Sequence, residues 1–324
     1  MSTLSDRAVE HLRQVADWPD LAGTRYEAQG LIGRGGMGSV YAARDSALGR
    51  EVALKVLSAP LAGPEGAARV LREARIIAGL EHPGIIPIHD VGTLSDGRVF
   101  YTMKLVRGTR LDAWAEGNRS LAERLRTLEC IAEAVAFAHA HDVVHRDLKP
   151  ANVMVGAFGE VLVMDWGVAK VLGSPRAGDR AADASVPASS PRPYGDVVTS
   201  PGAVLGTHGF MAPEQAAGGE VDARADVFGL GMLLGTLLPA GVAIPKRLEA
   251  IRRMATAPLP ESRYADAAGF AEDLRRFAAG ERVLAYPEGM LARLERLAAR
   301  YRVAILLVLA YLVMRLLLLA LGGP

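Results

Sequence analysis

Eight residues at 145–152 combine side chains that could carry out phosphoryl transfer. They read His-Arg-Asp-Leu-Lys-Pro-Ala-Asn, so that Asp147, Lys149 and Asn152 lie close together in the chain. In phosphoryl transfer a carboxylate receives the proton of the attacking hydroxyl, a cation offsets phosphate charge, and oxygen ligands hold magnesium. A second carboxylate, Asp165, follows thirteen residues after Asn152 and adds a possible metal ligand. The spacing therefore indicates a site that transfers a phosphoryl group with the help of Mg²⁺.

A glycine-rich segment at 33–40 could bind the phosphates of a nucleotide. It reads Gly-Arg-Gly-Gly-Met-Gly-Ser-Val, which is the spacing G-x-G-x-x-G-x-V. Glycines allow backbone amides to approach phosphates closely, because no Cβ stands in the way. A glycine-rich hairpin turn would look the same, and a dinucleotide-binding fold would need a helix directly after the glycines. Residues 39–42 continue as strand instead, which disfavours the dinucleotide-binding fold.

The elements that must position these residues change along the chain. Over residues 26–106, short apolar runs alternate with turns that contain Gly, Asp or Ser, which is typical of strands. One helix interrupts them at 66–80, where apolar residues return at helical spacing until Pro83. Beyond Gly108 the pattern is largely helical. The sequence thus predicts a strand-rich unit followed by a helical unit.

Together these motifs resemble the eukaryotic-like serine/threonine protein kinases of bacteria. The resemblance covers residues 26–283, and Lys149 in the catalytic loop indicates the serine/threonine branch. It implies an α+β, bilobal kinase fold with a small β-rich N-lobe at 26–106 and a larger helical C-lobe at 107–283. It also implies ATP and Mg²⁺ as cofactors and protein hydroxyl groups as phosphate acceptors. Two further motifs belong to the same resemblance, Met164-Asp165-Trp166-Gly167 and Ala212-Pro213-Glu214.

The resemblance assigns a role to each residue of the catalytic motifs. Asp147 is expected to orient and deprotonate the attacking hydroxyl, and Lys149 to neutralise the γ-phosphate. Asn152 and Asp165 are expected to bind Mg²⁺. Trp166 replaces the phenylalanine that usually follows the metal-binding aspartate, and its larger ring can still pack under the helix.

The resemblance also assigns the residues that bind ATP. Lys55 is expected to hold the α- and β-phosphates, with Glu73 on the helix at 66–80 as its partner and Glu81 as the less favoured alternative. Core packing would explain the apolar members of the set equally well. The expected ATP-binding residues are Ile32, Gly33, Arg34, Gly35, Gly36, Met37, Gly38, Val40, Ala53, Lys55, Glu73, Met103 and Met154.

In this resemblance the segment 165–214 is the activation segment. Its part at 173–196 is rich in Pro, Ala, Ser and Gly and lacks apolar periodicity, which is typical of disorder. Arg146 precedes the catalytic aspartate, and in the family such an arginine often implies control by a phosphate in the activation segment. A phosphate group pairs well with arginine. Thr199 and Ser200 are therefore candidates for autophosphorylation, the alternative being that they are ordinary loop residues.

One part of the family pattern is shortened. Only thirty-one residues separate Gly231 from Arg263, roughly half of what the family carries there. The pattern predicts two helices, at 231–238 and 245–254, without the intervening helix on which protein substrates dock. We therefore expect a narrow substrate range, such as the protein itself or a partner at the membrane.

Composition excludes some other classes of protein. The net charge is +1, so there is no electrostatic reason to expect nucleic acid as a partner. Cys130 is the only cysteine, which rules out an intramolecular disulfide and favours a reducing compartment. The nearby His139 and His141 read as a helix end and a turn rather than as zinc ligands. No secretory signal is visible, and residues 1–25 read as a mostly helical leader.

The end of the chain predicts a membrane-spanning helix. Residues 303–321 are apolar except for Arg315. As a helix they would extend about 28 Å, close to the hydrocarbon thickness of a bilayer. Arg315 would cost about 2.5–3.5 kcal/mol near the centre of the bilayer, which the leucines and valines offset. A buried terminal helix, or a helix that pairs with another chain, is the alternative.

The distribution of arginines predicts the orientation. Arg293, Arg296, Arg300 and Arg302 precede the span, and the positive-inside rule places that side in the cytoplasm. We therefore expect a single-pass protein of the inner membrane with its kinase domain in the cytoplasm. The segment 284–302 is basic and amphipathic, and its apolar stripe could lie on the membrane or pair two protomers in a homodimer.

Two other functions compete with an active protein kinase. A catalytically weak, ATP-binding membrane scaffold, or pseudokinase, would keep the fold without transferring phosphate, and the complete set of catalytic groups disfavours it. A small-molecule kinase of the same fold would generally lack the full set of motifs. The substrates, the activating signal and the oligomeric state do not follow from the sequence.

Overall fold

The computed structural model describes most of both predicted lobes and the C-terminal helix. The described residues are 18–35, 38–58, 63–166, 208–238, 241, 243–287 and 301–321. Within them, the side chains of residues 63–67, 69–70, 73, 302–305 and 316–321 are not described. Four predicted site residues fall outside the described residues, namely Gly36, Met37, Thr199 and Ser200.

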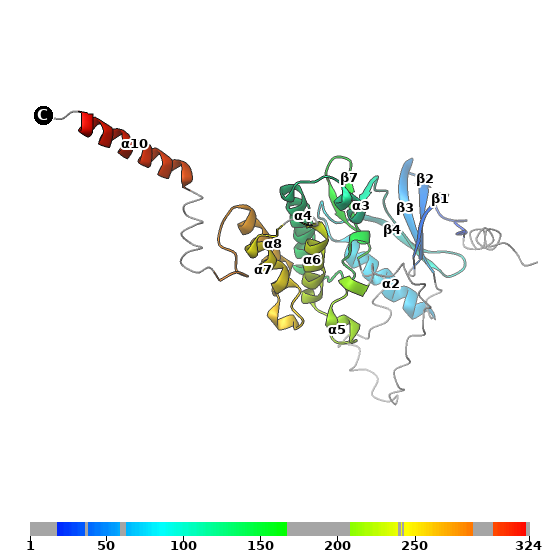
Figure 1. Cartoon of the computed structure of the whole chain (residues 1–324). Coiled ribbons are helices and arrows are strands. Elements are labelled where there is room, and N and C mark those ends of the chain that lie inside the picture. The colour runs from blue at the N-terminus through cyan, green and yellow to red at the C-terminus, as the bar shows by residue number, and fades with distance from the viewer. Residues whose placement is uncertain are drawn as a thin grey trace, which may run out of the picture.

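A five-stranded antiparallel sheet with the order β1-β2-β3-β5-β4 forms the N-lobe (Figure 1). Its strands are β1 Tyr26–Gly35, β2 Gly38–Asp45, β3 Arg50–Leu57, β4 Ile88–Thr93 and β5 Val99–Lys104. Because side chains alternate across a strand, Val52 and Leu54 of β3 pack into one apolar cluster, and Ala53 and Leu57 into another. The helix α2 (Gly63–Ala78) supplies further residues to the second cluster, so both faces of the sheet are covered.

A helical C-lobe follows, as the sequence predicts. Its helices are α3 Leu111–Glu116, α4 Leu121–His139, α5 Pro213–Ala216, α6 Ala223–Leu237, α7 Lys246–Ala255 and α8 Ala267–Ala278. The helix α4 begins at a capping box, in which the Ser120 hydroxyl accepts from the Glu123 N–H and the Glu123 carboxylate accepts from the Ser120 N–H. The carboxylates of Asp222 and Asp266 cap α6 and α8. Local signals therefore set where these helices begin.

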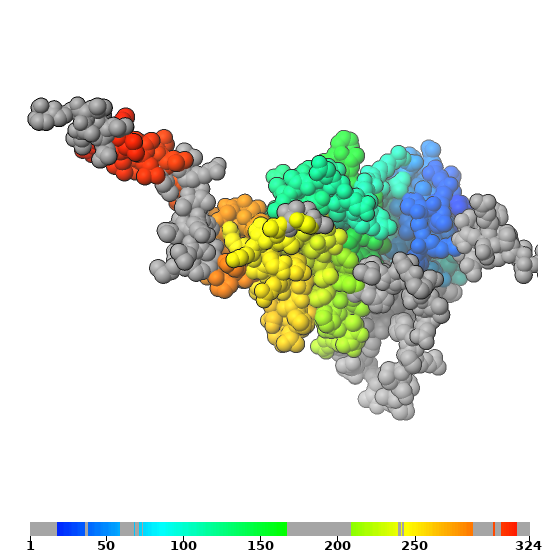
Figure 2. All heavy atoms as spheres, viewed as in Figure 1, coloured from blue at the N-terminus to red at the C-terminus, as the bar shows by residue number. Residues whose placement is uncertain are grey.

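A three-stranded sheet with the order β6-β7-β8 lies in the C-lobe beside α3. Its strands are β6 Gly108–Arg110, β7 Val153–Gly156 and β8 Val161–Val163. The turn between β7 and β8 stands out from the molecular surface (Figure 2). Gly159 in this turn has a φ of +84°, and the Phe158 N–H donates to the Glu160 carboxylate at 3.1 Å. The turn is thus held by its own bonds while the Phe158 side chain is 98% exposed.

Backbone hydrogen bonds link the loop before β4 to the C-lobe. The Val163 N–H donates to the Gly84 carbonyl at 2.8 Å, and the Ile86 N–H donates to the Val163 carbonyl at 3.2 Å. Ile85 and Val163 form a parallel bridge between these bonds. The strand that leads to Asp165 is therefore fixed to the loop that follows α2.

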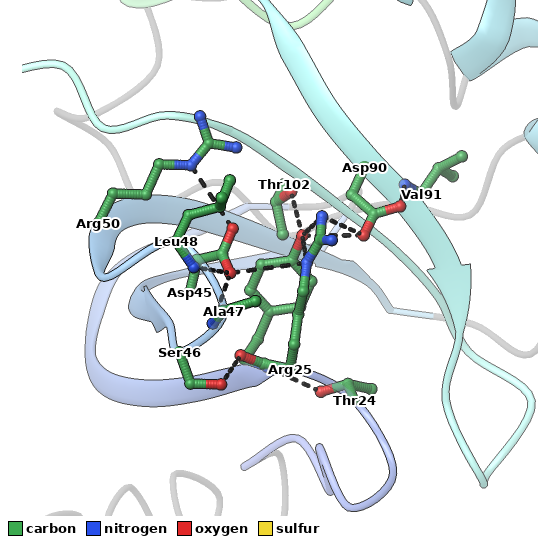
Figure 3. A network of polar contacts seen from close by, with 11 residues as sticks. Thr24, Arg25, Asp45, Ser46, Ala47, Leu48, Arg50, Asp90, Val91 and Thr102 are labelled. Carbon is green, nitrogen blue, oxygen red and sulfur yellow. Dashed lines mark hydrogen bonds and ion pairs between the residues drawn. The ribbon is translucent and has the colours of Figure 1, made fainter.

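A polar network fastens the start of β1 to the rest of the N-lobe (Figure 3). The carboxylate of Asp45 is fully buried, and its Oδ1 accepts from the N–H groups of Ala47 and Leu48 at 3.2 and 3.3 Å. Arg25 and Arg50 form ion pairs with the same carboxylate at 3.6 and 3.5 Å. Arg25 directly precedes β1, Asp45 ends β2 and Arg50 begins β3, so the network holds these three strands together at the edge of the sheet.

The connection between α6 and α7 is short. The helix α6 ends at Leu237 and α7 begins at Lys246, and the described residues of this connection contain no helix. The two helices that the sequence predicts are present, although α6 begins earlier, at Ala223. At the other end of the chain, residues 18–25 form turns and bends. Residues 1–17 lie outside the described part, so the mostly helical leader stays a prediction.

The helix α10 (Arg302–Leu321) covers the predicted span at 303–321 and stands apart from both lobes in Figure 1. Within the part of the chain that the structure describes, no helix is long and apolar enough to cross a membrane. The bilobal fold is therefore present, whereas a transmembrane helix is not found among the described residues.

Candidate active site

The catalytic loop is anchored to the helix α6 through Asp226. This carboxylate is 1% exposed and accepts from the backbone N–H groups of His145 and Arg146 at 2.7 and 2.8 Å. The ring of His139, at the end of α4, also contacts it at 2.9 Å. Arg146 has a φ of +65°, a left-handed conformation that is strained for a residue with a side chain. The buried aspartate therefore helps to hold the backbone just before Asp147.

Two polar residues of the loop, Lys149 and Asn152, converge on the carboxylate of Asp147. The Lys149 ammonium lies 2.9 Å from the Asp147 Oδ2, and the Asn152 amide donates to the same oxygen at 3.1 Å. The Asn152 amide also donates to the Asp147 carbonyl at 2.8 Å. Because Pro150–Asn152 form a 3₁₀ turn, residues five apart in sequence meet in space. With its nitrogen directed at Asp147, Asn152 presents its side-chain oxygen in another direction.

Lys55 and Asp165 form an ion pair across the cleft. Lys55 lies on β3 and Asp165 follows β8, and their Nζ and Oδ1 atoms are 2.5 Å apart. The buried lysine also interacts with the phenol of Tyr101, its cross-strand neighbour on β5. Burial alone would lower the pKa of Lys55, but Tyr101 and Asp165 outweigh burial and raise the pKa above its ordinary value. The lysine is therefore held as a cation.

The predicted partner of this lysine, Glu73, lies on α2, but its side chain is outside the described part of the chain. Its pairing with Lys55 stays a prediction. Tyr101 was not singled out by the sequence, because an aromatic residue in a buried strand reads as core packing.

Trp166 is a buried side chain that ties the Asp165 motif to the strand before it. Its indole N–H donates to the Val163 carbonyl at 3.1 Å, and its ring packs on the ring of His145 at 4.7 Å. The His145 Nε2 faces the Met164 carbonyl at 2.9 Å, and its Nδ1 accepts from the Asp147 N–H at 3.2 Å, which places the proton on Nε2. Burial lowers the pKa of His145 below its ordinary value, so the ring is neutral.

The glycine-rich segment forms the ends of β1 and β2, as the sequence predicts for a strand-turn-strand unit. Gly38 is required there for two reasons. Its φ is +149°, and a Cβ at this position would lie 2.2 Å from the Val56 carbonyl oxygen. A side chain would therefore push β2 away from β3.

A cavity of about 840 Å³ opens between the lobes, a size that suits a small-molecule cofactor. Several predicted ATP-binding residues line it, namely Ile32, Gly33, Val40, Ala53, Met103 and Met154. Asp165 lines it as well. Arg34, Gly35, Gly38 and Lys55 are described but are not among its lining residues. The structure thus places the predicted nucleotide cleft and the catalytic loop side by side.

The cavity has an outer part that the sequence did not reveal. Arg110 at the end of β6 lines it, as do Asp112 and Glu116 on α3. The Arg110 guanidinium pairs with Asp112 at 2.6 Å. Asp112 and Glu116 are four residues apart and so share one face of a helix, which is the only signal that could have suggested them.

A second buried ion pair joins two distant parts of the C-lobe. The Arg263 guanidinium donates to both carboxylate oxygens of Glu214, at 2.7 and 2.9 Å. Burial would raise the pKa of Glu214, but its bonds to Arg263 outweigh that effect and lower the pKa below its ordinary value. The pair fixes α5 to the loop before α8.

A family model described as the protein kinase domain matches residues 26–255. The chain belongs to the protein kinase family. The matched residues contain the glycine-rich hairpin, the cavity and the catalytic loop, so the kinase motifs and the observed cleft coincide.

Three curated relatives of this kinase come from bacteria. A probable serine/threonine-protein kinase SCO3848 of Streptomyces coelicolor is 40% identical over 227 residues, which cover 68% of the chain and 31% of the relative. The DNA damage-responsive serine/threonine-protein kinase RqkA of Deinococcus radiodurans is 41% identical over 66% of the chain and 29% of its own length. Serine/threonine-protein kinase PknB of Mycolicibacterium smegmatis is 35% identical over 81% of the chain and 44% of its own length. The chain thus spans less than half the length of these relatives.

A solved structure has the same fold. The kinase domain of PknI from Mycobacterium tuberculosis is similar with a TM-score of 0.57 and 26% sequence identity, over 80% of this kinase and 98% of that domain. The similarity extends over both lobes.

Proposed function

We propose that this chain is an active serine/threonine protein kinase that transfers the γ-phosphoryl group of ATP to hydroxyl groups of proteins. One observation carries the proposal: Lys149 and Asn152 converge on the Asp147 carboxylate at 2.9 and 3.1 Å, next to the cavity between the lobes. The bacterial relatives are serine/threonine kinases by name, which supports the choice of hydroxyl acceptor.

The geometry supports a separate role for each polar residue beside the cavity. Asp147, aligned by the Asn152 amide, would accept the proton of the attacking hydroxyl. Lys149 would offset charge on the transferring phosphoryl group, and Lys55 would hold the α- and β-phosphates. Asn152 and Asp165 would hold Mg²⁺, because an amide oxygen and a carboxylate are hard oxygen donors that suit this ion. When bound, the ion neutralises charge on the phosphates.

The test is phosphoryl transfer from ATP by the full chain purified in detergent, with Asp147→Asn as the matched variant. The substitution keeps the shape of the side chain and removes the base. We expect a rate loss on the order of 10²–10⁴-fold with ATP binding retained. ATP binding without transfer in the unmodified protein would instead indicate a scaffold. The structure gives that alternative no support, since the catalytic groups are assembled.

We also infer that the kinase phosphorylates its own activation segment at Thr199 or Ser200, which lie outside the described residues. Arg146, next to the catalytic aspartate, supports this inference because a cation at that place can pair with a phosphate. Phosphosite mapping by mass spectrometry tests it. Phosphate at either position should be absent from the Asp147→Asn protein, and phosphate found only elsewhere would overturn the inference.

We further propose that the segment 303–321 anchors the kinase in the inner membrane as a single pass, with the kinase domain in the cytoplasm. The proposal rests on the apolar run 303–321 as a whole and on the four arginines before it. It is supported by the large apolar side chains at 306–309 and 311–314, each between 51% and 66% exposed, which cover every side of the helix. In such a segment only lipid or another chain can remove this surface from water.

Alkaline extraction of bacterial membranes tests the anchor. An anchored kinase should stay in the membrane pellet, and Leu307→Lys together with Val313→Lys should release it. Retention of the doubly substituted protein would contradict insertion. Recovery of the unmodified kinase as a soluble homodimer would instead favour pairing of α10 with a second copy.

We propose, finally, a narrow range of protein substrates. The short connection between α6 and α7 supports this, because it leaves little surface of the kind on which kinases dock proteins. Rapid phosphorylation of many unrelated soluble proteins by the purified kinase would count against it.

A further inference from the structure

The peptide group between Arg146 and Asp147 is held on both of its sides. Its N–H, which belongs to Asp147, donates to the His145 Nδ1 at 3.2 Å. Its carbonyl, which belongs to Arg146, accepts from the side-chain amide of Gln215 at 3.0 Å. A peptide group is planar, so these two bonds fix the plane from which the Asp147 side chain departs.

The orientation of the Gln215 amide is determined by a second bond. Its oxygen accepts from the Ala212 N–H at 3.3 Å, at the start of α5, while its nitrogen donates to Arg146. With the amide oxygen and nitrogen exchanged, the nitrogen would face the Ala212 N–H and the oxygen would face the Arg146 carbonyl. Neither contact is a hydrogen bond, so the two partners determine the orientation of the amide. Gln215 is therefore both a cap of α5 and a donor to the catalytic loop.

The bond matters because the loop conformation is strained at this point. The φ of Arg146 is +65°, and such a conformation persists only when the surroundings determine it. Asp226 on α6 holds the Arg146 N–H from one side. Gln215 holds its carbonyl from α5, the helix at the end of the segment 165–214 that the sequence assigns as the activation segment.

We propose that Gln215 is a positioning residue that sets the direction of the Asp147 carboxylate by fixing the Arg146 carbonyl. Through this bond the placement of α5 is transmitted to the catalytic base. This inference rests on the proposed kinase function and adds a residue that none of the catalytic motifs includes.

Two substitutions separate the two bonds of the amide. Gln215→Glu has the same shape and still accepts from the Ala212 N–H, but its ionised carboxylate cannot donate to the Arg146 carbonyl. Gln215→Met loses both bonds. If Gln215 positions the base, both variants should lower kcat by about threefold to tenfold, the effect of one hydrogen bond, and leave the KM for ATP within about twofold. If Gln215 only caps α5, Gln215→Glu should keep the full kcat, which would overturn the proposal.

Ala216→Ser is the matched control, because Ala216 is exposed on the same short helix and should leave kcat unchanged. The rate of hydrogen exchange in the peptide that contains Asp147 is a second measurement, and it does not require kinase activity. Faster exchange there in Gln215→Glu than in the unmodified chain is expected. Unchanged hydrogen exchange in Gln215→Glu would overturn the proposal, even if the unmodified chain transferred no phosphate. Full activity in Gln215→Glu would refute the positioning role of Gln215 and leave the proposed kinase function intact.

Discussion

At the scale of single residues, Trp166 has a bond that the usual phenylalanine could not make. Its indole N–H donates to the Val163 carbonyl, which also accepts from the Ile86 N–H. One carbonyl therefore joins the residue after Asp165 to the loop that follows α2. The tryptophan fixes the Asp165 motif to the end of β8, and any movement of the motif away from Val163 would break this hydrogen bond.

The buried ring of His145 should make the free energy of unfolding depend on pH. Its pKa is lowered by burial in the folded state, so below about pH 6.5 the unfolded chain binds a proton that the folded chain does not. The stability that the protein has with His145 neutral is fully present above that pH and is lost as the pH falls below it. Urea unfolding between pH 5 and pH 8 should show a decline of up to about 1.4 kcal/mol per pH unit from this one group.

His145→Phe is the comparison that isolates the effect. The phenyl ring can still pack on Trp166 but cannot titrate. His82 and His89, whose pKa values burial also lowers, remain in both proteins. The variant should be less stable at pH 8, and its stability should fall less steeply toward pH 5. Parallel curves would show that His145 is not the titrating group.

At the scale of elements, the Asp45 network fastens the first strand of the N-lobe. It joins the start of β1, the β2–β3 turn and β4, where Asp90 accepts from Tyr26 at 2.9 Å (Figure 3). The strand it secures carries the glycine-rich segment at its other end. The network therefore contributes to the position of the cleft from a distance.

Asp45→Asn should destabilise the protein by about 1–3 kcal/mol, the cost of leaving buried polar groups without suitable partners. The amide keeps the shape of the carboxylate but places an N–H donor next to the Arg50 Nε, which is also a donor. Denaturant unfolding measures the loss. Asp96→Asn is the control, since Asp96 is exposed and pairs with Arg98 at the surface, where such pairs contribute at most about 1 kcal/mol.

How far the sequence predicts the site depends on how local each contact is. Asp147, Lys149 and Asn152 could be predicted to meet because they share one turn of chain. The pairing of Lys55 with Asp165 was not predicted, because it joins residues 110 positions apart and depends on how the lobes close. The Gln215 bond depends on a side-chain orientation that no local pattern encodes.

At the scale of the whole molecule, polar contacts among the described residues join the two lobes beside the cavity. The Lys55–Asp165 pair reaches from β3 to the end of β8, and the bonds around Val163 lie behind it. The sequence predicted the two lobes well because strand and helix periodicities differ. The contact between the lobes, and the part of the cavity lined by Arg110, Asp112 and Glu116, follow from tertiary packing that no single segment specifies.

ATP with Mg²⁺ should stabilise the whole protein by binding across this cleft. At a ligand concentration of about 100 times the Kd, the free energy of unfolding should rise by about 2.7 kcal/mol. Lys55→Met should lose most of this increment at the same ligand concentration, because the α- and β-phosphates lose their cation. Thermal unfolding with and without ligand measures the increment within each protein.

Lys246→Met is the matched control, since this lysine is exposed at the start of α7, outside the cleft. It should keep the full increment. An equal increment in Lys55→Met would show that the lysine does not contact the nucleotide.

The turn between β7 and β8 offers a place for an optical reporter. Phe158 projects into solvent from a turn that is held by its own hydrogen bonds, and Met154 on the adjacent strand β7 lines the cavity. Burial, together with Glu133 and Glu129, raises the pKa of the Cys130 thiol, so this native thiol reacts slowly with alkylating dyes. A dye attached through Phe158→Cys would therefore sit at one defined point, and its emission could follow nucleotide entry in real time without a radioactive substrate.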